Sequence, residues 1–289
     1  MAGPVSKTIS IVDKDFSSGS QTKKILSIEL GLDGFSFTIL DVLEFKYQVL
    51  ESYQWTEGSS WENICGLLES IIKANPVLTE NFERVNIAYF SPQLNLVPFE
   101  VFQHLHKDAY HDFVAATPPA HDVITDRLNN LKAYGVYSFP GVLQKKLNYY
   151  FPSHRIRHSG SVLIESLLAA AKLREWEADI VLQIRPDHVE IILMDKQQLI
   201  FYNAFRYQTL DDLMYYLFFV LEKFNLEASG MRAMLIGEVS LDSELYRMLS
   251  AYFRESGFMP RSDFYKYSRE FESIPHHFFY NLLNLNSCG

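Results

Sequence analysis

The sequence predicts a mixed α/β protein that contains one folding unit twice. A stretch in the first half of the chain aligns without gaps to a stretch in the second half, and the elements predicted after the two stretches follow in the same order. The chain has 289 residues, of which 48% are hydrophobic and 21% are charged. Such a chain can bury the core of one large or two medium domains, and it is not expected to be disordered.

The repeated stretch has the pattern of two strands joined by a turn. ILSIELGLDGFSFTILD at residues 25–41 lies over DIVLQIRPDHVEIILMD at residues 179–195, so that Asp33 falls on Asp187. Apolar residues alternate with a period of two in both copies, which is typical of a strand with one buried face. We therefore expect a β-hairpin in each half. Chance similarity between short alternating strands is the alternative interpretation.

A strand, a helix and another strand are expected after the first hairpin. The third strand covers residues 45–53. Ser59 and Glu62 have the spacing of a capping box, which satisfies backbone N–H groups at the start of a helix. This helix is expected to end near Ala74, just before a proline. The apolar residues 85–90 predict the next strand.

The second half repeats this order. A strand over residues 198–204 precedes a helix that starts at Thr209 and reaches about Phe224. A strand over residues 233–236 follows. The two halves therefore share the order strand, strand, strand, helix, strand.

One more helix is expected in the second half. Ser240 or Asp242 would cap its start. The helix would reach about Glu255, and Gly257 would close it.

These elements divide the chain into a flexible lead-in over residues 1–20, a first domain over residues 21–176 and a second domain over residues 177–289. The first domain is longer because it carries an insertion, which begins after residue 90. This extra part is expected to hold a strand-turn-strand hairpin over residues 122–139 and helices over residues 140–150 and 161–174.

Composition disfavours several classes of protein. The net charge is −9 and no basic run exceeds two residues, so nucleic acid is not an expected partner. Cys65 and Cys288 follow no metal or redox spacing and suit a reducing compartment. The most apolar run, LMYYLFFVL at residues 213–221, is shorter than the roughly 20 residues that span a bilayer. Since the N-terminus has no signal-peptide pattern, we expect a cytoplasmic protein without a membrane span.

Five stretches carry a resemblance to a known superfamily. They are KKILSIELGLDGFSFTILD, VNIAYFSPQLNLVPFEVF, ADIVLQIRPDHVEIILMDKQQLIFYNAF, AMLIGEVSLDSELYRML and IPHHFFYNLLNLNSCG. In order and pattern the chain resembles the actin-like ATPases. It is more similar to the degenerate actin-like proteins of secretion and pilus assembly, and most similar to an uncharacterised family of Bacteroidetes. The resemblance implies two ribonuclease-H-like domains, with mixed five-stranded sheets that face each other across a nucleotide cleft.

The resemblance also implies where a nucleotide would bind. In the superfamily each hairpin carries an Asp and, two positions later, a Gly that lets backbone N–H groups approach phosphate oxygens. The first hairpin has Glu29 and Gly31 at these positions, so it keeps half of the pattern. The second hairpin has Gln183 and Arg185, and Pro186 removes one more N–H donor.

A third element normally offers two adjacent glycines to the adenosine, and here it reads Gly237-Glu238. We therefore expect a vestigial nucleotide cleft without catalytic residues, a metal site, or ATP and Mg²⁺ as cofactors. The residues assigned to this vestigial cleft are Glu29, Gly31, Asp33, Gly34, Gln183, Arg185, Asp187, Gly237 and Glu238.

Arg185 leaves two interpretations open. Its guanidinium could offer several donors to an anion in the same cleft. It could instead pair with Glu29 or Asp187, which lie on the same loops. The second interpretation is favoured.

Four other groups of residues are candidate sites. His104, His106 and His111-Asp112 could indicate a metal, as could His276-His277, but polar side chains at a solvated surface explain them more simply. HSGS at residues 158–161 has no GxSxG pattern and is expected to be a turn that enters a helix. The tail is dense in aromatic residues, which core packing explains first and a protein-binding surface second. These aromatic residues are Phe264, Tyr265, Tyr267, Phe271, Phe278, Phe279 and Tyr280.

Taken together, the sequence predicts a non-catalytic actin-like protein that acts as a protein-binding scaffold or assembly factor, by binding other proteins or itself. Two alternatives stay open. One is an ATP-binding or ATP-hydrolysing enzyme of the actin-like or sugar-kinase-like kind. The other is a sensor that binds an anionic small molecule in the interdomain cleft.

Overall fold

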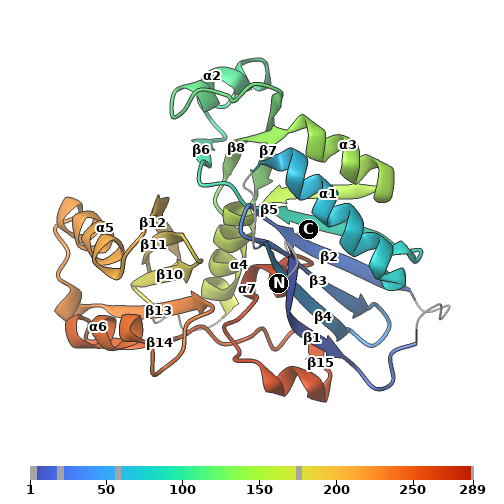
Figure 1. The fold of residues 1–289 in the computed structure, drawn as a ribbon. Coiled ribbons are helices and arrows are strands. Elements are labelled where there is room, and N and C mark those ends of the chain that lie inside the picture. The colour runs from blue at the N-terminus through green and yellow to red at the C-terminus, as the bar shows by residue number, and fades with distance from the viewer. Residues whose placement is uncertain (1–4, 18–22, 56–59, 174–177, 288–289) are drawn as a thin grey trace.

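The computed structural model describes residues 5–17, 23–55, 60–173 and 178–287, and it forms two α/β lobes (Figure 1). The first lobe contains a seven-stranded sheet in the order β1-β4-β3-β2-β5-β9, with β15 paired to β4. Its strands are β1 Val5–Val12, β2 Lys24–Leu30, β3 Gly34–Asp41, β4 Lys46–Trp55, β5 Arg84–Tyr89, β9 His154–His158 and β15 Lys266–Tyr267.

Helices cover both faces of this sheet. One face packs against α1 (Trp61–Ala74) and α3 (Gly141–Tyr150), which bury Leu68 and Leu147 against the strands. The other face meets α4 (Ser159–Leu173) and α7 (Tyr280–Asn284). Short 3-10 turns lie at Pro76–Thr79, His104–His106, Ala228–Gly230 and Arg269–Ser273.

The second lobe repeats the central part of the first. Its five strands have the order β12-β11-β10-β13-β14, which matches β4-β3-β2-β5-β9 strand for strand. The strands are β10 Ile180–Ile184, β11 His188–Asp195, β12 Gln198–Arg206, β13 Arg232–Gly237 and β14 Glu255–Phe258. Helices α5 (Leu210–Lys223) and α6 (Glu244–Tyr252) pack on one face. The opposite face packs on α4, which therefore lies between the two sheets.

The strand registers confirm the repeat. In the first hairpin Leu30 pairs with Phe35, and in the second Ile184 pairs with Val189 at the positions that the alignment makes equivalent. The irregularity in the next pair of strands also recurs, after Ile39 in one lobe and after Leu193 in the other. A register shared to the level of a bulge is the mark of one folding unit used twice. The predicted fold class is thus confirmed, with β1 and β15 added to the edge of the first five-stranded core.

The N-cap of α1 differs from the prediction. Ser59 lies outside the described residues, and Ser60 caps α1 by accepting a hydrogen bond from the Asn63 N–H. Thr209 and Asp212 do form the reciprocal capping box of α5.

The start and end of the last predicted helix were also wrong. Ser243, rather than Ser240 or Asp242, caps α6 through the Tyr246 N–H. The helix stops at Tyr252, because the chain then runs parallel to β13 as strand β14, and Gly257 lies in that strand instead of closing a helix.

The predicted insertion forms a small sheet of its own. The hairpin expected over residues 122–139 is present as β7 (His121–Leu128) and β8 (Ala133–Pro140), and β6 (Asn95–Pro98) pairs with β8. Helix α2 (Lys107–Asp112) lies over this sheet at the tip of the first lobe (Figure 1). No helix in the described ranges combines the length and apolar character that crossing a membrane requires.

The chain after Met259 returns to the first lobe, which the sequence did not predict. Strand β15 pairs parallel to β4, and the Tyr47 hydroxyl donates to the Leu283 carbonyl at 2.7 Å. Most of the aromatic tail is packed here or between the lobes; Phe271 is fully buried, whereas Phe264 is 68% exposed. The boundaries proposed for the two domains stay a prediction. The last part of the chain, which was assigned to the second domain, packs on the first lobe.

This return segment gives a test of its contribution to stability. Phe271→Ala should lower the free energy of unfolding by about 3–5 kcal/mol, because it leaves a cavity between β4 and the tail. Phe264→Ala is the matched control and should cost less than about 1 kcal/mol, because its ring is exposed. Urea denaturation measures both. Equal costs for the two variants would mean that the tail does not contribute to the core of the first lobe.

Candidate functional site

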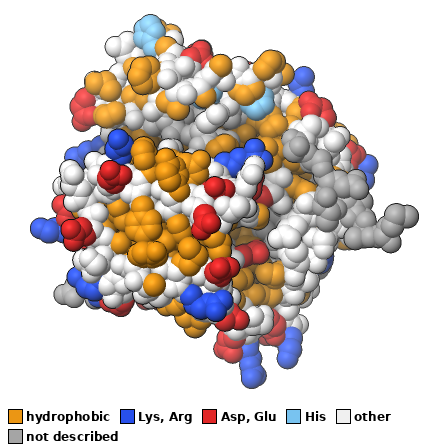
Figure 2. All heavy atoms as spheres, turned by 60° about the vertical axis from the view of Figure 1, so that its left-hand side comes forward, with side chains coloured by type: hydrophobic (Ala, Val, Ile, Leu, Met, Phe, Trp, Pro, Cys, Tyr) orange, Lys and Arg blue, Asp and Glu red, His pale blue; other side chains and the backbone are white. Residues whose placement is uncertain are grey.

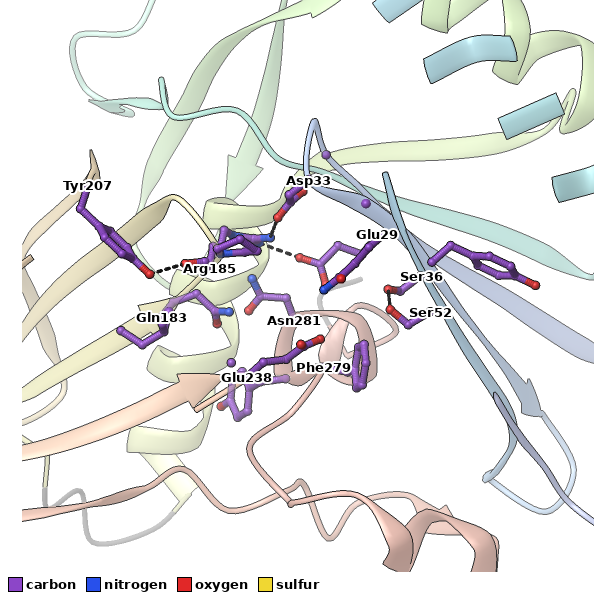
Figure 3. Close-up of a pocket in the computed structure, with 18 residues that line it drawn as sticks. Glu29, Asp33, Ser36, Ser52, Gln183, Arg185, Tyr207, Glu238, Phe279 and Asn281 are labelled. Carbon is purple, nitrogen blue, oxygen red and sulfur yellow. Dashed lines mark hydrogen bonds and ion pairs between the residues drawn. The ribbon is translucent and has the colours of Figure 1, made fainter. Parts of the chain in front are cut away.

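A cavity of about 260 Å³ lies where the two lobes meet (Figure 3). The first lobe supplies the turn between β2 and β3 and parts of β3 and β4. The second lobe supplies the ends of β10 and β13, and the start of α7 lies beneath. The cavity is lined by Glu29, Gly31, Asp33, Gly34, Ser36, Ser52, Tyr53, Gln54, Gln183, Ile184, Arg185, Pro186, Tyr207, Gly237, Glu238, Phe279, Tyr280 and Asn281.

Arg185 crosses from the second lobe to the first inside this cavity. One guanidinium nitrogen, Nη2, donates to Glu29 at 2.7 Å, and Nη1 lies 3.6 Å from Asp33. On its own lobe, Nε donates to Glu190 at 3.1 Å. The plane of the group lies over the Phe90 ring at 4.0 Å. Nε and Nη2 of the guanidinium therefore donate hydrogen bonds, and Nη1 makes a longer ion-pair contact with Asp33.

The carboxylate of Glu190 is buried without exposure to solvent in β11. The Tyr202 hydroxyl donates to its second oxygen at 2.7 Å. Burial raises the pKa of Glu190, while Arg185 and Tyr202 act in the opposite direction. Burial alone would lower the pKa of Arg185, but the surrounding carboxylates, Glu29 first, raise it above its ordinary value. The guanidinium consequently stays charged.

Ser159 at the start of α4 links this network to the end of the chain. Its hydroxyl donates to Glu29 at 3.1 Å and accepts from the Arg185 Nη2 at 2.8 Å. It also accepts from the Asn281 side-chain nitrogen at 2.8 Å. Residues from four separate parts of the chain therefore meet at one hydroxyl group.

The turns of the two hairpins close on themselves. The Gly31 N–H donates to the Gly34 carbonyl, and in the second hairpin the Arg185 N–H donates to the His188 carbonyl. Gly237 has a φ of 98°, and a Cβ there would meet the Ile184 carbonyl oxygen of the neighbouring strand. The close packing of β10 against β13 therefore explains why this position needs a glycine, without any role for a ligand.

Eight of the nine residues predicted for the cleft line the cavity. Asp187 is the exception: it faces His188 at 2.8 Å and lies 3.8 Å from the exposed Arg206. The expected pairing of Arg185 with an acid is therefore present with Glu29 and absent with Asp187.

Sequence reasoning missed four residues of the network: Glu190, Tyr202, Ser159 and Asn281. One signal was available for Glu190, which is the only charge in the otherwise apolar run VEIILM of a strand. A lone charge in a buried strand needs a partner of opposite sign. The HSGS stretch, which was expected to be a turn before a helix, supplies Ser159 as the first residue of α4.

The other predicted clusters are spread out. His111 is buried, and its ring lies 3.0 Å from the Thr117 hydroxyl, whereas His104 packs on aromatic rings. The His277 ring contacts the Val239 carbonyl at 2.7 Å. Cys65 is a buried free thiol, and Cys288 lies outside the described residues. Within the described ranges, no three His, Cys, Asp or Glu side chains are arranged to hold a metal ion.

Comparison with known proteins identifies the fold. The family described as Protein of unknown function (DUF3822) matches residues 13–255. A protein from Bacteroides thetaiotaomicron with an actin-like ATPase fold and unknown function superposes with a TM-score of 0.74 at 20% identity, covering 84% of this chain and 93% of that one. A chain of the PilM–PilN type IV pilus biogenesis complex superposes with a TM-score of 0.66 at 13% identity, covering 91% and 98%.

These similarities confirm the predicted actin-like ATPase fold and the relation to an uncharacterised actin-like family. A search among curated proteins finds no match. That the family is found in Bacteroidetes stays a prediction.

The buried ion network predicts a large effect of one substitution. Arg185→Met should lower the free energy of unfolding by about 3–5 kcal/mol, because it leaves the Glu190 carboxylate buried without its charged partner. Adding Glu190→Gln should recover a substantial part of this loss. Urea denaturation of the single and double variants measures both effects, with Arg206→Met at an exposed position as the control.

The loss should also depend on pH. Because burial raises the pKa of Glu190, the folded variant binds a proton more readily than the unfolded chain, and stability falls as pH rises above the usual glutamate pKa of about 4.3. The deficit of Arg185→Met is therefore expected to be larger at pH 8 than at pH 5. A deficit below about 1 kcal/mol at both pH values would contradict the role assigned to Arg185.

Proposed function

This chain belongs to the family described as Protein of unknown function (DUF3822), and we propose that it is a non-catalytic actin-like protein that binds other proteins as a scaffold or assembly factor. The observation that carries the proposal is the position of Arg185. Its guanidinium lies between the two hairpins, bonded to Glu29 of one lobe and Glu190 of the other. A triphosphate would have to displace this network before it could reach the backbone of either turn.

The chemistry of the cavity also disfavours a nucleotide with Mg²⁺. Carboxylates of Glu29, Asp33 and Glu238 line a space that holds one guanidinium, so a polyanion would be repelled. Gln183 stands at the end of β10 where the superfamily has a metal-binding Asp, and Pro186 offers no N–H to a phosphate. The residues present do not fit Mg-ATP, and we assign no step to it.

The same contacts argue against the anion sensor. The Nε and Nη2 atoms of Arg185 already donate hydrogen bonds to Glu190, Glu29 and Ser159. The Nη1 atom faces the Asp33 carboxylate, which would repel an anion. Charge-assisted bonds of this kind are strong when buried, so a weakly bound anion does not replace them. The favoured function therefore does not use Arg185 as a ligand-binding group.

A surface suited to protein binding lies on the second lobe. Figure 2 shows hydrophobic side chains gathered on the side of the molecule where this lobe lies. Tyr215 and Phe219 on α5 stack on each other with ring centres 6.2 Å apart and are 64% and 40% exposed. Ile200 on β12 and Phe224 after α5 are also exposed. Aromatic residues on a surface are enriched where partners bind.

Strand β12 indicates the form of the partner. It lies at the end of the five-stranded sheet, and no strand pairs with its outer edge within the described residues. An exposed edge beside an apolar surface is suited to an extended segment that adds to the sheet by β-augmentation. We therefore assign this surface to an extended segment of a partner protein. The PilM–PilN complex supports the idea that a chain of this fold can act through a protein partner.

As part of this proposal, the protein acts in the cytoplasm and does not bind nucleic acid. The expected absence of catalysis has a direct measurement. Isothermal titration with Mg-ATP should give no saturable binding up to about 1 mM, and turnover of ATP should equal that of Glu29→Ala. Binding below about 1 mM that Glu29→Ala abolishes would show a working nucleotide site and contradict the proposal.

The partner surface has a separate measurement. A photo-crosslinking residue in place of Ile200, in extracts of the source cells, should label one protein through an extended segment. Tyr215→Ser combined with Phe219→Ser should abolish the labelling, while Tyr149→Ser on α3, where the ring is 77% exposed, should not. Labelling that survives the double variant, or crosslinks only to a second copy of the chain, would exclude this partner.

A further inference from the structure

We infer that the cavity between the lobes binds a small organic cation with a primary ammonium group. The inference concerns the space beside the Arg185 network, on the side of Gln183, Glu238 and Asn281 (Figure 3). It goes beyond the scaffold function, because it assigns a ligand class to a cavity that the scaffold function does not use.

Two unpartnered amide oxygens point to a ligand. Gln183 is 7% exposed and Asn281 is 1% exposed, and both line the cavity. The side-chain oxygen of each is buried and accepts no hydrogen bond from any residue that the structure describes. A buried acceptor without a donor destabilises the folded protein. Two such oxygens at one cavity therefore need an explanation. A ligand that brings hydrogen-bond donors supplies one.

The orientation of the Asn281 amide is fixed by its neighbours. Its nitrogen donates to the Ser159 hydroxyl at 2.8 Å. Ser159 has one proton, which it donates to Glu29, so its oxygen can only accept from Asn281. Turning the amide over would set two acceptors against each other. The Asn281 oxygen is therefore held as an acceptor, and none of the described residues donates to it.

The charge around the cavity calls for a cation. Arg185 supplies one positive charge, whereas Glu29, Asp33 and Glu238 each supply a carboxylate to the lining and Glu190 adds another behind it. Burial and then Asp33 raise the pKa of Glu238, and burial also raises the pKa of Asp33. The carboxylates are thus incompletely compensated by the groups on the chain.

An ammonium group fits these acceptors better than a metal ion does. It has three donors, which match the two amide oxygens and the carboxylate of Glu238. Tyr207, Phe279 and Tyr280 add aromatic rings to the lining, and ring faces attract organic cations. Phe279 adopts a left-handed backbone conformation with φ 55°, which is unusual for a bulky residue. A volume of about 260 Å³ accommodates a short alkylamine.

Titration calorimetry with the full chain tests the inference. The probes are 1-aminobutane and 1,4-diaminobutane, with 1-butanol and butanoate as neutral and anionic controls. Both amines should bind, and the two controls should not. Glu238→Gln should weaken amine binding about tenfold or more, since it removes a charged acceptor. Glu222→Gln at an exposed position of α5, outside the cavity, should leave the affinity unchanged.

A second variant separates ligand binding from folding. Gln183→Leu removes an oxygen that has no partner in the described part of the chain, so it should not lower the unfolding midpoint. It should nevertheless weaken amine binding several-fold. A free amine and a lysine side chain of a partner protein would bring the same ammonium group to the cavity. N-acetyl-lysine amide is therefore a further probe, which distinguishes the two.

Three results would overturn the inference. These are no heat from either amine at about 10 mM, equal binding of 1-butanol, or an equal loss in Glu238→Gln and Glu222→Gln. None of them bears on the scaffold function, which depends on the Mg-ATP and crosslinking results. Failure of the two ideas can therefore be told apart.

Discussion

A positive charge buried between two lobes has to be balanced by both of them, and in this protein that charge is the Arg185 guanidinium. Taking it out of water costs several kcal/mol unless carboxylates and hydrogen-bond acceptors surround it. Glu29 and Asp33 come from the first lobe for this purpose, and Glu190 comes from the second. The network thus joins the two lobes at the cavity between the hairpins, and its carboxylates outnumber its one guanidinium.

Two further features hold the lobes in this relation. Helix α4 packs between the two sheets, and its first residue, Ser159, is bonded to Glu29, Arg185 and Asn281. The chain after Met259 also leaves the second lobe and joins the sheet of the first. Because the ends of the two units are interleaved, a structural change at the cavity would affect both lobes. This arrangement suits the scaffold function that we propose.

Most of the fold could be predicted from the sequence, whereas only part of the residues around Arg185 could. Strands with strict alternation, such as Leu26 to Leu30, and helices with a local cap, such as Thr209 with Asp212, are determined by neighbours in the chain, so they could be predicted. The end of α6 depends on Phe253 and β14 packing beside β13, which is a tertiary choice. Asn281 and Ser159 meet across a long stretch of chain, and no local pattern marks such a contact. The role of Glu190 follows only once its partner is known to be Arg185.

The central proposal is that the Arg185 network leaves no room for a nucleotide between the two hairpins. A high-resolution crystal structure grown with an excess of Mg-ATP tests it most directly. We predict that Arg185 will bridge Glu29 and Glu190 with no nucleotide between the hairpins. A triphosphate lying between the two turns, with the guanidinium swung away from Glu29, would contradict the account.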